Sequence, residues 1–323
     1  MVHSTSRPAA GGLSAREVLF TGSAHPGLAG AVAGAAGCGL GLCTVERYPD
    51  GEVSVVVGQP VRRRDVYLLQ STSPPVNEHL VELLALADAC RRGAAARITA
   101  VVPYFGYSRA DKRHGRREPI TAGMVADLFQ AVGIAHVVTV DPHTPQLEGF
   151  FRIPVDSLTA LPLLCEALRS RLAPDAVVVS PDAGRVRMAT EYAARLDRPL
   201  VVLHKRRRSG TQTAVTHLVG DVRGRACLVI DDMIATGGTM AETIEALLEA
   251  GARAEIVVAA THGLLLPGAR DKLSHAAVRE IVVTDTVRVE AEVRPPPTVV
   301  SVAPLLAGAI QRFLADGSLS DLY

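Results

Sequence analysis

Cysteine is scarce in this sequence, and the few cysteines have no regular spacing. The 323 residues contain five of them: Cys38, Cys43, Cys90, Cys165 and Cys227. Zinc sites use cysteines in closely spaced pairs, and a disulfide framework uses an even number of them. The sequence shows neither pattern, so we expect a protein of a reduced, cytoplasmic compartment.

An excess of one charge is also absent. Lysine and arginine number 34 against 33 aspartates and glutamates, which leaves a net charge of +1. This balance argues against a protein whose whole surface binds nucleic acid, so any basic chemistry must be local. Hydrophobic residues at 48% and charged residues at 21% are close to the averages of soluble globular proteins. A chain of this length is long enough for two domains.

A strongly hydrophobic run is missing too. The first 18 residues have no apolar segment after their few charges, so no signal peptide is expected. Residues 27–45 carry no charge and approach the length of a membrane span, but six of these nineteen residues are glycine. We therefore expect a small-residue helix that packs on the fold and frays toward its end, with membrane insertion as the disfavoured alternative.

The sequence does contain a regular alternation of Val- and Ile-rich runs with helical patterns, which predicts parallel sheets covered by helices. The expected strands are 18–22, 53–57, 66–70, 98–102, 136–140, 176–180, 200–204, 227–231, 255–260 and 280–285. Helices are expected at 77–92, 121–133 and 160–172 and after Thr239, with Asn77 and Thr121 as N-caps. We predict two similar α/β domains, 15–155 and 156–323, with the C-terminal segment packing back on the first.

Residues 228–239, LVIDDMIATGGT, form the most informative stretch of the chain. An apolar strand ends in two carboxylates, Asp231 and Asp232, and a glycine-containing loop and a helical pattern follow. The loop consists of Ala235, Thr236, Gly237, Gly238 and Thr239. Glycines let the backbone approach an anion, threonine hydroxyls add donors, and the N–H groups that begin a helix favour negative charge. Since two carboxylates suit sugar hydroxyls or a divalent metal, the stretch predicts a pocket for a sugar phosphate.

An ordinary strand-to-helix turn is the alternative, because short glycine motifs recur by chance. The full run favours the pocket, because it resembles the signature of the type I phosphoribosyltransferase fold. In that fold the acidic pair meets the ribose hydroxyls and the glycine loop holds the 5-phosphate. The resemblance implies an α/β protein of two phosphoribosyltransferase-type domains, each a mainly parallel sheet flanked by helices.

Two other segments are rich in basic residues. Residues 103–118 combine three aromatic residues with Arg109 and further cations, and residues 203–210 contain four consecutive cations that begin at Lys205. Such loops suit a polyphosphate, since guanidinium groups grip phosphates bidentately and aromatic rings can stack on a base. The alternatives are a solvated or nucleic-acid-binding loop in the first case and an exposed basic tag in the second.

Polar residues at the ends of strands indicate a metal site. Asp141 and His143 follow one expected strand, and Asp182 follows another. Each alone is more often a structural residue, but one imidazole and two carboxylates together suit a hydrated magnesium ion. The turn RYPDGEV carries two further carboxylates, Asp50 and Glu52, which by themselves indicate only a turn.

Nearly the whole chain, from about residue 17 to Tyr323, resembles the ribose-phosphate pyrophosphokinases, also called phosphoribosyl pyrophosphate synthetases. The motifs that carry the likeness occur in the expected order: YPDGEVSV, QSTSPPVNEHLVELL, RITAVVPYFGYSRADKR, REPITA, TVDPHTPQLEGFF, VVSPDAG, HKRRR, GDVRGRACLVIDDMIATGGT and SVAPLLAGAI. Phosphoribosyltransferases share only the DDMIATGGT segment. The resemblance implies transfer of the β,γ-pyrophosphoryl group of MgATP to the 1-hydroxyl of ribose 5-phosphate, giving 5-phosphoribosyl 1-pyrophosphate and AMP.

The resemblance also implies a role for each matching residue. The nucleotide would be contacted by Arg109 and Ala110, and its adenosine by Asp50, Gly51 and Glu52 of a neighbouring subunit. Mg²⁺ would be held by His143 and Asp182, and charge on the migrating group would be stabilised by Lys205 and Arg207. The ribose hydroxyls would bind Asp231 and Asp232, and the 5-phosphate would be held by Ala235, Thr236, Gly237, Gly238 and Thr239. No Walker-type motif occurs, so these loops must hold ATP. The implied partners are ATP and ribose 5-phosphate in a homohexamer, with no nucleic acid and no membrane.

The chain departs from the family pattern at four positions. Ala235 stands where an aspartate is usual, Ala110 where a glutamine is usual, Arg185 where a glycine is usual, and Met188 where an arginine is usual. Of these departures, Ala110, Ala235 and Met188 favour a second hypothesis, a non-catalytic regulatory subunit that associates with an active synthetase. A third hypothesis is a phosphoribosyltransferase, which would not need the PYFGY and DGE segments.

Overall fold

The structure, a computed structural model, describes residues 16–113, 115–207, 213–290, 292–315 and 317–322. The chain forms two compact units. The first contains the residues up to Leu158 and those from Ala303 onward, and the second extends from Thr159 to Val302. Each unit has its own sheet and its own hydrophobic core.

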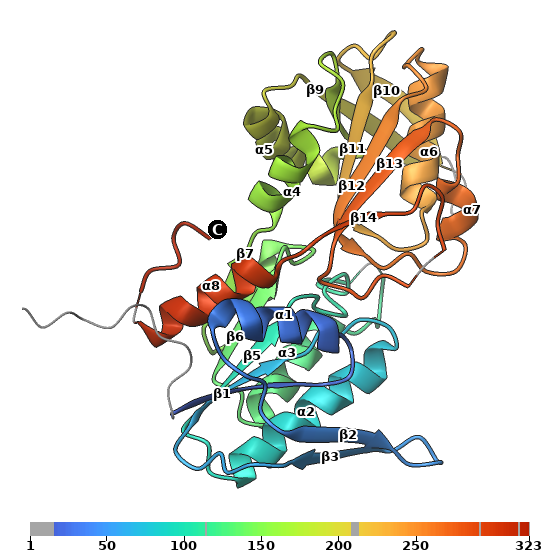
Figure 1. Ribbon diagram of the computed structural model, residues 1–323. Helices are drawn as coiled ribbons and strands as arrows, with labels where there is room; N and C mark the ends of the chain where they lie inside the picture. Colours follow the sequence, from blue (N-terminus) through green and yellow to red (C-terminus); the bar gives the residue numbers. More distant parts are fainter. Residues whose placement is uncertain (1–15, 114, 208–212, 291, 316, 323) are drawn as a thin grey trace, which may run out of the picture. The chain divides into compact units, whose positions relative to one another are not determined.

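The first unit is built on a parallel sheet with the strand order β1-β4-β5-β6-β7. The strands are β1 (Glu17–Thr21), β4 (Asp65–Leu69), β5 (Arg97–Val102), β6 (His136–Val140) and β7 (Val155–Leu158). The helices are α1 (Pro26–Ala36), α2 (Val76–Arg92), α3 (Thr121–Ala131), the 3-10 helix η1 (Pro145–Phe150) and α8 (Ala303–Leu314). Helix α2 packs on β4 and β5 (Figure 1). The strand β6, which lies between β5 and β7, is buried along its whole length, as expected for a sheet covered on both faces.

The second unit contains a seven-stranded sheet with the order β10-β9-β8-β11-β12-β13-β14. The strands are β8 (Val177–Ser180), β9 (Leu200–Arg207), β10 (Thr213–Val219), β11 (Cys227–Ile234), β12 (Ile256–Gly263), β13 (Val278–Thr284) and β14 (Thr298–Val300). All pairs are parallel except β9 with β10. Figure 1 shows α4 (Leu161–Arg169) and α5 (Val186–Leu196) on one side of this sheet and α6 (Gly238–Glu249) and α7 (Ala269–Leu273) on the other. The predicted α/β architecture is confirmed.

The strand expected at 53–57 forms, but outside the parallel sheet. It is β3 (Val53–Val57), which pairs antiparallel with β2 (Cys43–Arg47) in a two-stranded hairpin. The strands β2, β7, β10 and β14 have no counterpart in the prediction. They lie in the hairpin or at a sheet edge. Strands in these places bury less surface than central strands, so their hydrophobic pattern is weak.

The predicted N-caps, Asn77 and Thr121, are both wrong. Helix α2 begins at Val76, and α3 begins at Thr121 itself. In neither helix does the residue before the first turn make a side-chain capping bond. Asn77 instead accepts a hydrogen bond from the Tyr107 hydroxyl, so a tertiary contact takes the place of the local one.

The glycine- and alanine-rich segment forms the expected small-residue helix over its first part only. Helix α1 ends at Ala36, where Gly37 adopts a left-handed conformation with φ 72°. The helix packs against α8, and its small residues permit a close approach of the two helix axes. No helix within the described ranges is long and apolar enough to cross a membrane.

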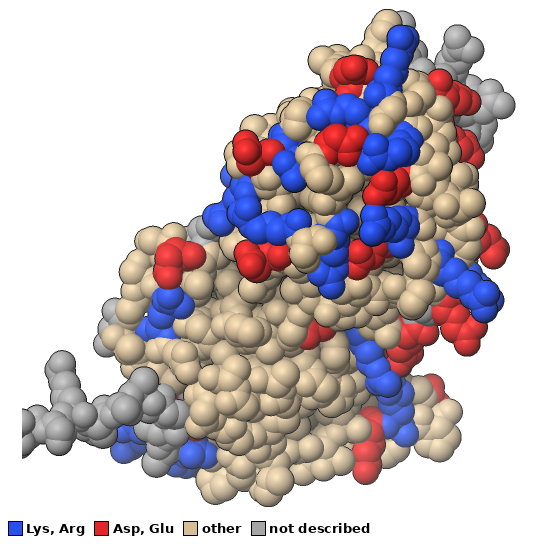
Figure 2. Space-filling view, turned by 45° about the horizontal axis from the view of Figure 1, so that its top comes forward, with Lys and Arg blue, Asp and Glu red and all other residues tan. Residues whose placement is uncertain are grey.

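Charged side chains of both signs are interspersed over the second unit (Figure 2). One chain of ion pairs joins Asp175, Arg253, Glu255 and Arg279, with Arg253 donating to both oxygens of Asp175 at 2.8 and 2.9 Å. The Arg253 guanidinium holds the pKa of Asp175 below its usual value. This surface therefore alternates acidic and basic groups, in line with the balanced composition.

All five cysteines are free thiols, and three of them are deeply buried. Burial raises the pKa of Cys90 to about 12 and the pKa of Cys165 and Cys227 to about 11. A thiol must ionise to react, so we expect a thiol reagent at about pH 8 to modify at most Cys38 and Cys43 in the native protein. All five thiols should react after denaturation, and rapid labelling of more than two in the folded protein would contradict this burial.

Candidate active site

The glycine loop predicted to hold a phosphate joins β11 to α6 in the second unit. The loop is anchored by two backbone bonds, in which Leu265 and Leu266 donate to the carbonyls of Ile234 and Ala235, both at 2.9 Å. Gly237 precedes α6 with φ 72°, a left-handed conformation that favours glycine. Helix α6 has no side-chain cap and no acidic residue in its first turn. Its first N–H groups can therefore bind an anion.

Two carboxylates lie directly before this loop, at the end of β11. The exposed fractions of Asp231 and Asp232 are 8% and 1%. The Asp231 Oδ1 atom accepts a bond from the Asp232 amide at 2.9 Å, which fixes the orientation of the first carboxylate. Burial raises the pKa of Asp231 well above its usual value, and the neighbouring Asp232 raises it further. The strand thus presents a buried acidic pair near a helix terminus whose N–H groups can bind an anion.

Arg185 bridges the two carboxylates. Its Nε atom donates to Asp231 Oδ1 at 2.8 Å, and its Nη2 atom lies 2.8 Å from Asp232 Oδ1. Arg185 ends a short 3-10 helix, η2 (Ala183–Arg185), immediately before α5. The guanidinium opposes the rise in the pKa of Asp231, so it favours the ionised form of that carboxylate.

The two residues predicted to hold a metal lie in different units. Asp182 follows β8 and caps η2, where its Oδ1 atom accepts a bond from the Gly184 amide at 2.8 Å. His143 lies in the loop after β6, beside Thr144. Within the described ranges, no three histidine, cysteine or acidic side chains are grouped as a metal site.

A cavity of about 440 Å³ in the first unit contains the next predicted pair. Arg109 and Ala110 both line it. The other lining residues are Pro75, Val76, Asn77, Glu78, Tyr104 and Tyr107. Two aromatic rings, a guanidinium and an amide thus share one cavity, and Ala110 leaves it wider than a longer side chain would.

Asp50, Gly51 and Glu52 form the exposed tip of the β2–β3 hairpin. The tip is closed by the Tyr48 amide, which donates to the Glu52 carbonyl at 2.9 Å, and by the Asp50 carboxylate, which accepts from the Glu52 amide at 3.1 Å. Gly51 has φ 93°, which favours glycine at this turn. The tip carries two carboxylates into solvent.

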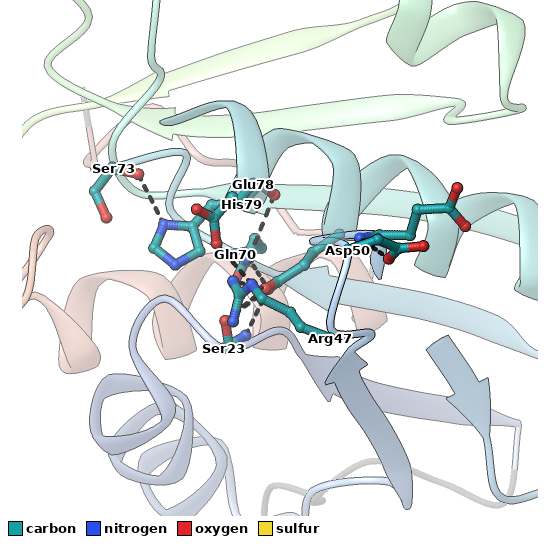
Figure 3. A network of polar contacts seen from close by, with 9 residues as sticks. Ser23, Arg47, Asp50, Gln70, Ser73, Glu78 and His79 are labelled. Atoms are coloured by element: carbon teal, nitrogen blue, oxygen red, sulfur yellow. Dashed lines mark hydrogen bonds and ion pairs between the residues drawn. The ribbon is translucent and has the colours of Figure 1, made fainter. Parts of the chain in front are cut away.

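A polar network fixes the base of this hairpin (Figure 3). Arg47, the last residue of β2, pairs with Glu78 at 2.6 Å and with Glu82 at 2.7 Å. The Glu82 side chain is fully buried. It also accepts bonds from the Ser23 amide at 2.9 Å, the Ser23 hydroxyl at 2.7 Å and Gln70 Nε2 at 2.7 Å. Because Glu78 also lines the cavity, the first turns of α2 connect the hairpin to the cavity.

Lys205 and Arg207 are in the last part of β9. The structure describes only their backbone, which pairs antiparallel with β10, with Lys205 opposite Val215 and Arg207 opposite Thr213. The predictions about their side chains lie outside the described part of the chain. The side chains of Arg47 and Glu82 were not predicted to matter, and the Arg185 contact with the acidic pair has no sequence signal beyond the unusual arginine.

These features define a class of protein with two α/β units, one carrying a phosphoribosyltransferase-type loop and the other an arginine- and tyrosine-lined cavity. Known families match both units. Residues 17–133 match the N-terminal domain of ribose phosphate pyrophosphokinase, and residues 163–290 match the phosphoribosyl transferase domain. The chain belongs to the ribose-phosphate pyrophosphokinase family.

Individual relatives agree with this assignment. The ribose-phosphate pyrophosphokinase of Streptomyces avermitilis is 43% identical over 314 residues, 95% of this chain and 95% of its own length. That of Caldanaerobacter subterraneus is 43% identical over 307 residues, 94% of this chain and 97% of its own. The crystal structure of phosphoribosylpyrophosphate synthetase from Mycobacterium smegmatis superposes with a TM-score of 0.87 at 42% identity, covering 94% of this chain and all of that one.

Proposed function

We propose that this protein transfers the β,γ-pyrophosphoryl group of MgATP to ribose 5-phosphate. The 1-hydroxyl oxygen attacks the β-phosphorus, the bond between that phosphorus and the α–β bridging oxygen breaks, and AMP leaves. The observation that carries the proposal is the buried pair Asp231 and Asp232 on the strand whose following loop leads into a helix terminus without a side-chain cap. Carboxylates can accept hydrogen bonds from a sugar diol while backbone amides hold its phosphate.

The residues of the second unit would hold the sugar phosphate. Asp231 and Asp232 accept from the ribose hydroxyls, and residues 235–239 surround the 5-phosphate with backbone N–H groups and two threonine hydroxyls. Ala235 contributes only backbone, so this loop binds phosphate without a third carboxylate. Lys205 and Arg207 are the cations proposed to stabilise the migrating group, since phosphoryl transfer depends on positioning and charge neutralisation.

The residues of the first unit would hold the nucleotide. Arg109 would contact the phosphates from the cavity wall, where Tyr104 and Tyr107 offer aromatic surface to the base. The exposed hairpin tip, with Asp50 and Glu52, suits an adenosine bound in a neighbouring subunit, which agrees with a proposed homohexamer. We place this assembly in the cytoplasm.

Mg²⁺ is proposed as the cofactor, and the chain's donor groups fit it in part. The half-buried carboxylate of Asp182 is a hard oxygen ligand of the kind that Mg²⁺ prefers, whereas the imidazole of His143 suits contact through a water molecule. When bound, the ion would neutralise charge on the transferred phosphates. Asp182 is already held by Gly184, so its carboxylate is oriented before the ion arrives.

A non-catalytic regulatory subunit is the second candidate function. The observation that favours it is the Arg185 side chain, which already occupies the acidic pair that ribose would need. Ala110 and Met188 support the same hypothesis, because each replaces a residue that the family usually carries.

The decisive experiment measures AMP and 5-phosphoribosyl 1-pyrophosphate formation by the purified protein. We expect both products in equal amounts, strictly dependent on ribose 5-phosphate and Mg²⁺, and a panel of nucleoside triphosphates will show what Ala110 does to nucleotide choice. Absence of turnover, combined with tight binding to an active homologue, would instead support the regulatory subunit. Base-dependent release of pyrophosphate would support a phosphoribosyltransferase.

Gly237 gives a specific test of the loop. Alanine in a left-handed backbone conformation costs about 1–2 kcal/mol. Relief of this strain should turn the first amides of α6 away from the proposed phosphate, so Gly237→Ala should raise the KM for ribose 5-phosphate about tenfold. Gly224→Ala is the matched control, because Gly224 has φ 66° and lies in a different turn of the same unit. The control should lose similar stability but keep the wild-type KM, and equal KM values for both variants would contradict a phosphate site at this loop.

A further inference from the structure

The Arg185 side chain contacts both carboxylates of the acidic pair at the proposed ribose site. One guanidinium edge reaches both carboxylates, through Nε to Asp231 and through Nη2 to Asp232, and both distances are 2.8 Å. The side chains of Arg185, Asp231 and Asp232 are 17%, 11% and 2% exposed. Charge-assisted hydrogen bonds between groups this well buried are strong, so the ligand-free protein is held in this arrangement.

The guanidinium resembles the proposed ligand in the pattern of donors it presents. Its Nε and Nη2 groups are two adjacent N–H donors in a fixed planar fork. The vicinal hydroxyls of a ribose are also two adjacent donors, and the same pair of carboxylates is proposed to accept from them. The Arg185 bonds end on one Oδ1 atom of each carboxylate, so the arginine and a diol bound to the same pair compete for these acceptors.

We propose that Arg185 is a specificity-determining residue that occupies the ribose site as an internal substitute for the sugar diol. The sugar binds Asp231 and Asp232 after the guanidinium has moved away, and its apparent affinity is reduced by the fraction of molecules in which Arg185 is bound. This inference rests on the proposed function, because it assumes that ribose hydroxyls bind the acidic pair.

The position of Arg185 in the chain supports a side chain that can leave. Arg185 immediately precedes α5, whose first turn has no acidic residue, and the positive end of a helix dipole disfavours a cation. The attraction of the two carboxylates therefore holds the guanidinium in place despite its repulsion by the positive end of the α5 dipole. The side chain is partly exposed, so rotation about its own bonds carries it toward water and requires no rearrangement of the sheet.

The substitution Arg185→Ala tests the competition directly. We expect ribose 5-phosphate to bind about tenfold more tightly by calorimetry in the absence of nucleotide, and its KM to fall by a similar factor while kcat changes little. The affinity for 2-deoxyribose 5-phosphate should rise much less, because that sugar lacks one of the hydroxyls that replace the guanidinium. Both affinities are measured over a range of pH, because loss of the Arg185 charge raises the pKa of Asp231 further.

Matched variants separate competition from other effects. Arg187→Ala removes a nearby arginine whose side chain is 85% exposed and pairs with Glu191 on the surface, and it should leave both sugar affinities unchanged. Arg185→Gln keeps most of the side-chain volume, folds if the alanine variant does not, and should show an intermediate gain. Unchanged or weaker ribose 5-phosphate binding in Arg185→Ala or Arg185→Gln, or an equal gain for both sugars, would overturn the proposal. Failure of the wild-type protein to form AMP while these binding changes occur would overturn the proposed reaction but not the competition.

Discussion

Replacing Lys205 with alanine is expected to lower the kcat of pyrophosphoryl transfer about a hundredfold or more, as loss of one group that stabilises transition-state charge does. The reaction moves a highly charged group between two oxygens, and little covalent chemistry is left for the protein to perform. A cation at the migrating group therefore acts mainly in the transition state. The KM for ribose 5-phosphate should change little, since the sugar is proposed to bind at β11 and the loop after it.

Arg206→Ala is the matched control for this variant. Residues 205 and 206 are neighbours in β9 and both pair with β10, so either substitution perturbs the same stretch of ladder. The control should keep near wild-type turnover, with the rate measured as AMP formed at saturating substrates. If Lys205→Ala retains near wild-type kcat, or if both variants lose activity equally, Lys205 has no specific catalytic role.

The positions of the acidic pair and the glycine loop, between a buried strand and a helix, could be predicted from the sequence because the pattern is local. A buried strand, two carboxylates, a glycine turn and a helix follow one another within residues 228–249, and the structure shows this order. The turn at Asp50 and Glu52 was predictable for the same reason. The strand at 53–57 was expected, but its antiparallel pairing in a hairpin was not, because a short Val-rich run looks alike in a parallel sheet and in a hairpin.

Contacts between distant residues account for most of what the sequence did not reveal. Glu82 lies inside a helical pattern, where a glutamate ordinarily indicates an exposed face. Its partners Ser23, Arg47 and Gln70 are 59, 35 and 12 residues away, so no local window contains the reason for its burial. Arg185 is similar, because its two carboxylates lie on a strand that follows 46 residues later. Such residues are recognised only after the fold brings their partners together.

Replacing Glu82 with alanine should destabilise the first unit by about 2–4 kcal/mol, because each donor left without its acceptor costs about 1–3 kcal/mol. Glu82 accepts bonds from the Ser23 amide, from Gln70 Nε2 and from Arg47. After the substitution, the Ser23 amide and Gln70 Nε2 lose this acceptor at a site with little access to water. A lower midpoint of denaturant unfolding at unchanged slope would measure the loss.

Glu78→Ala provides the control, because Glu78 pairs with the same Arg47 one helical turn earlier but is 45% exposed. An exposed ion pair contributes at most about 1 kcal/mol, so this variant should be nearly as stable as the wild type. Arg47 directly precedes the turn that carries Asp50 and Glu52. Loss of its buried partner should therefore also raise the KM for ATP, by loosening the hairpin tip proposed to reach a neighbouring subunit's nucleotide. Equal losses of stability in the two variants would show that the burial of Glu82 does not determine how much this network stabilises the protein. An unchanged KM for ATP in Glu82→Ala would show that the network does not affect nucleotide binding.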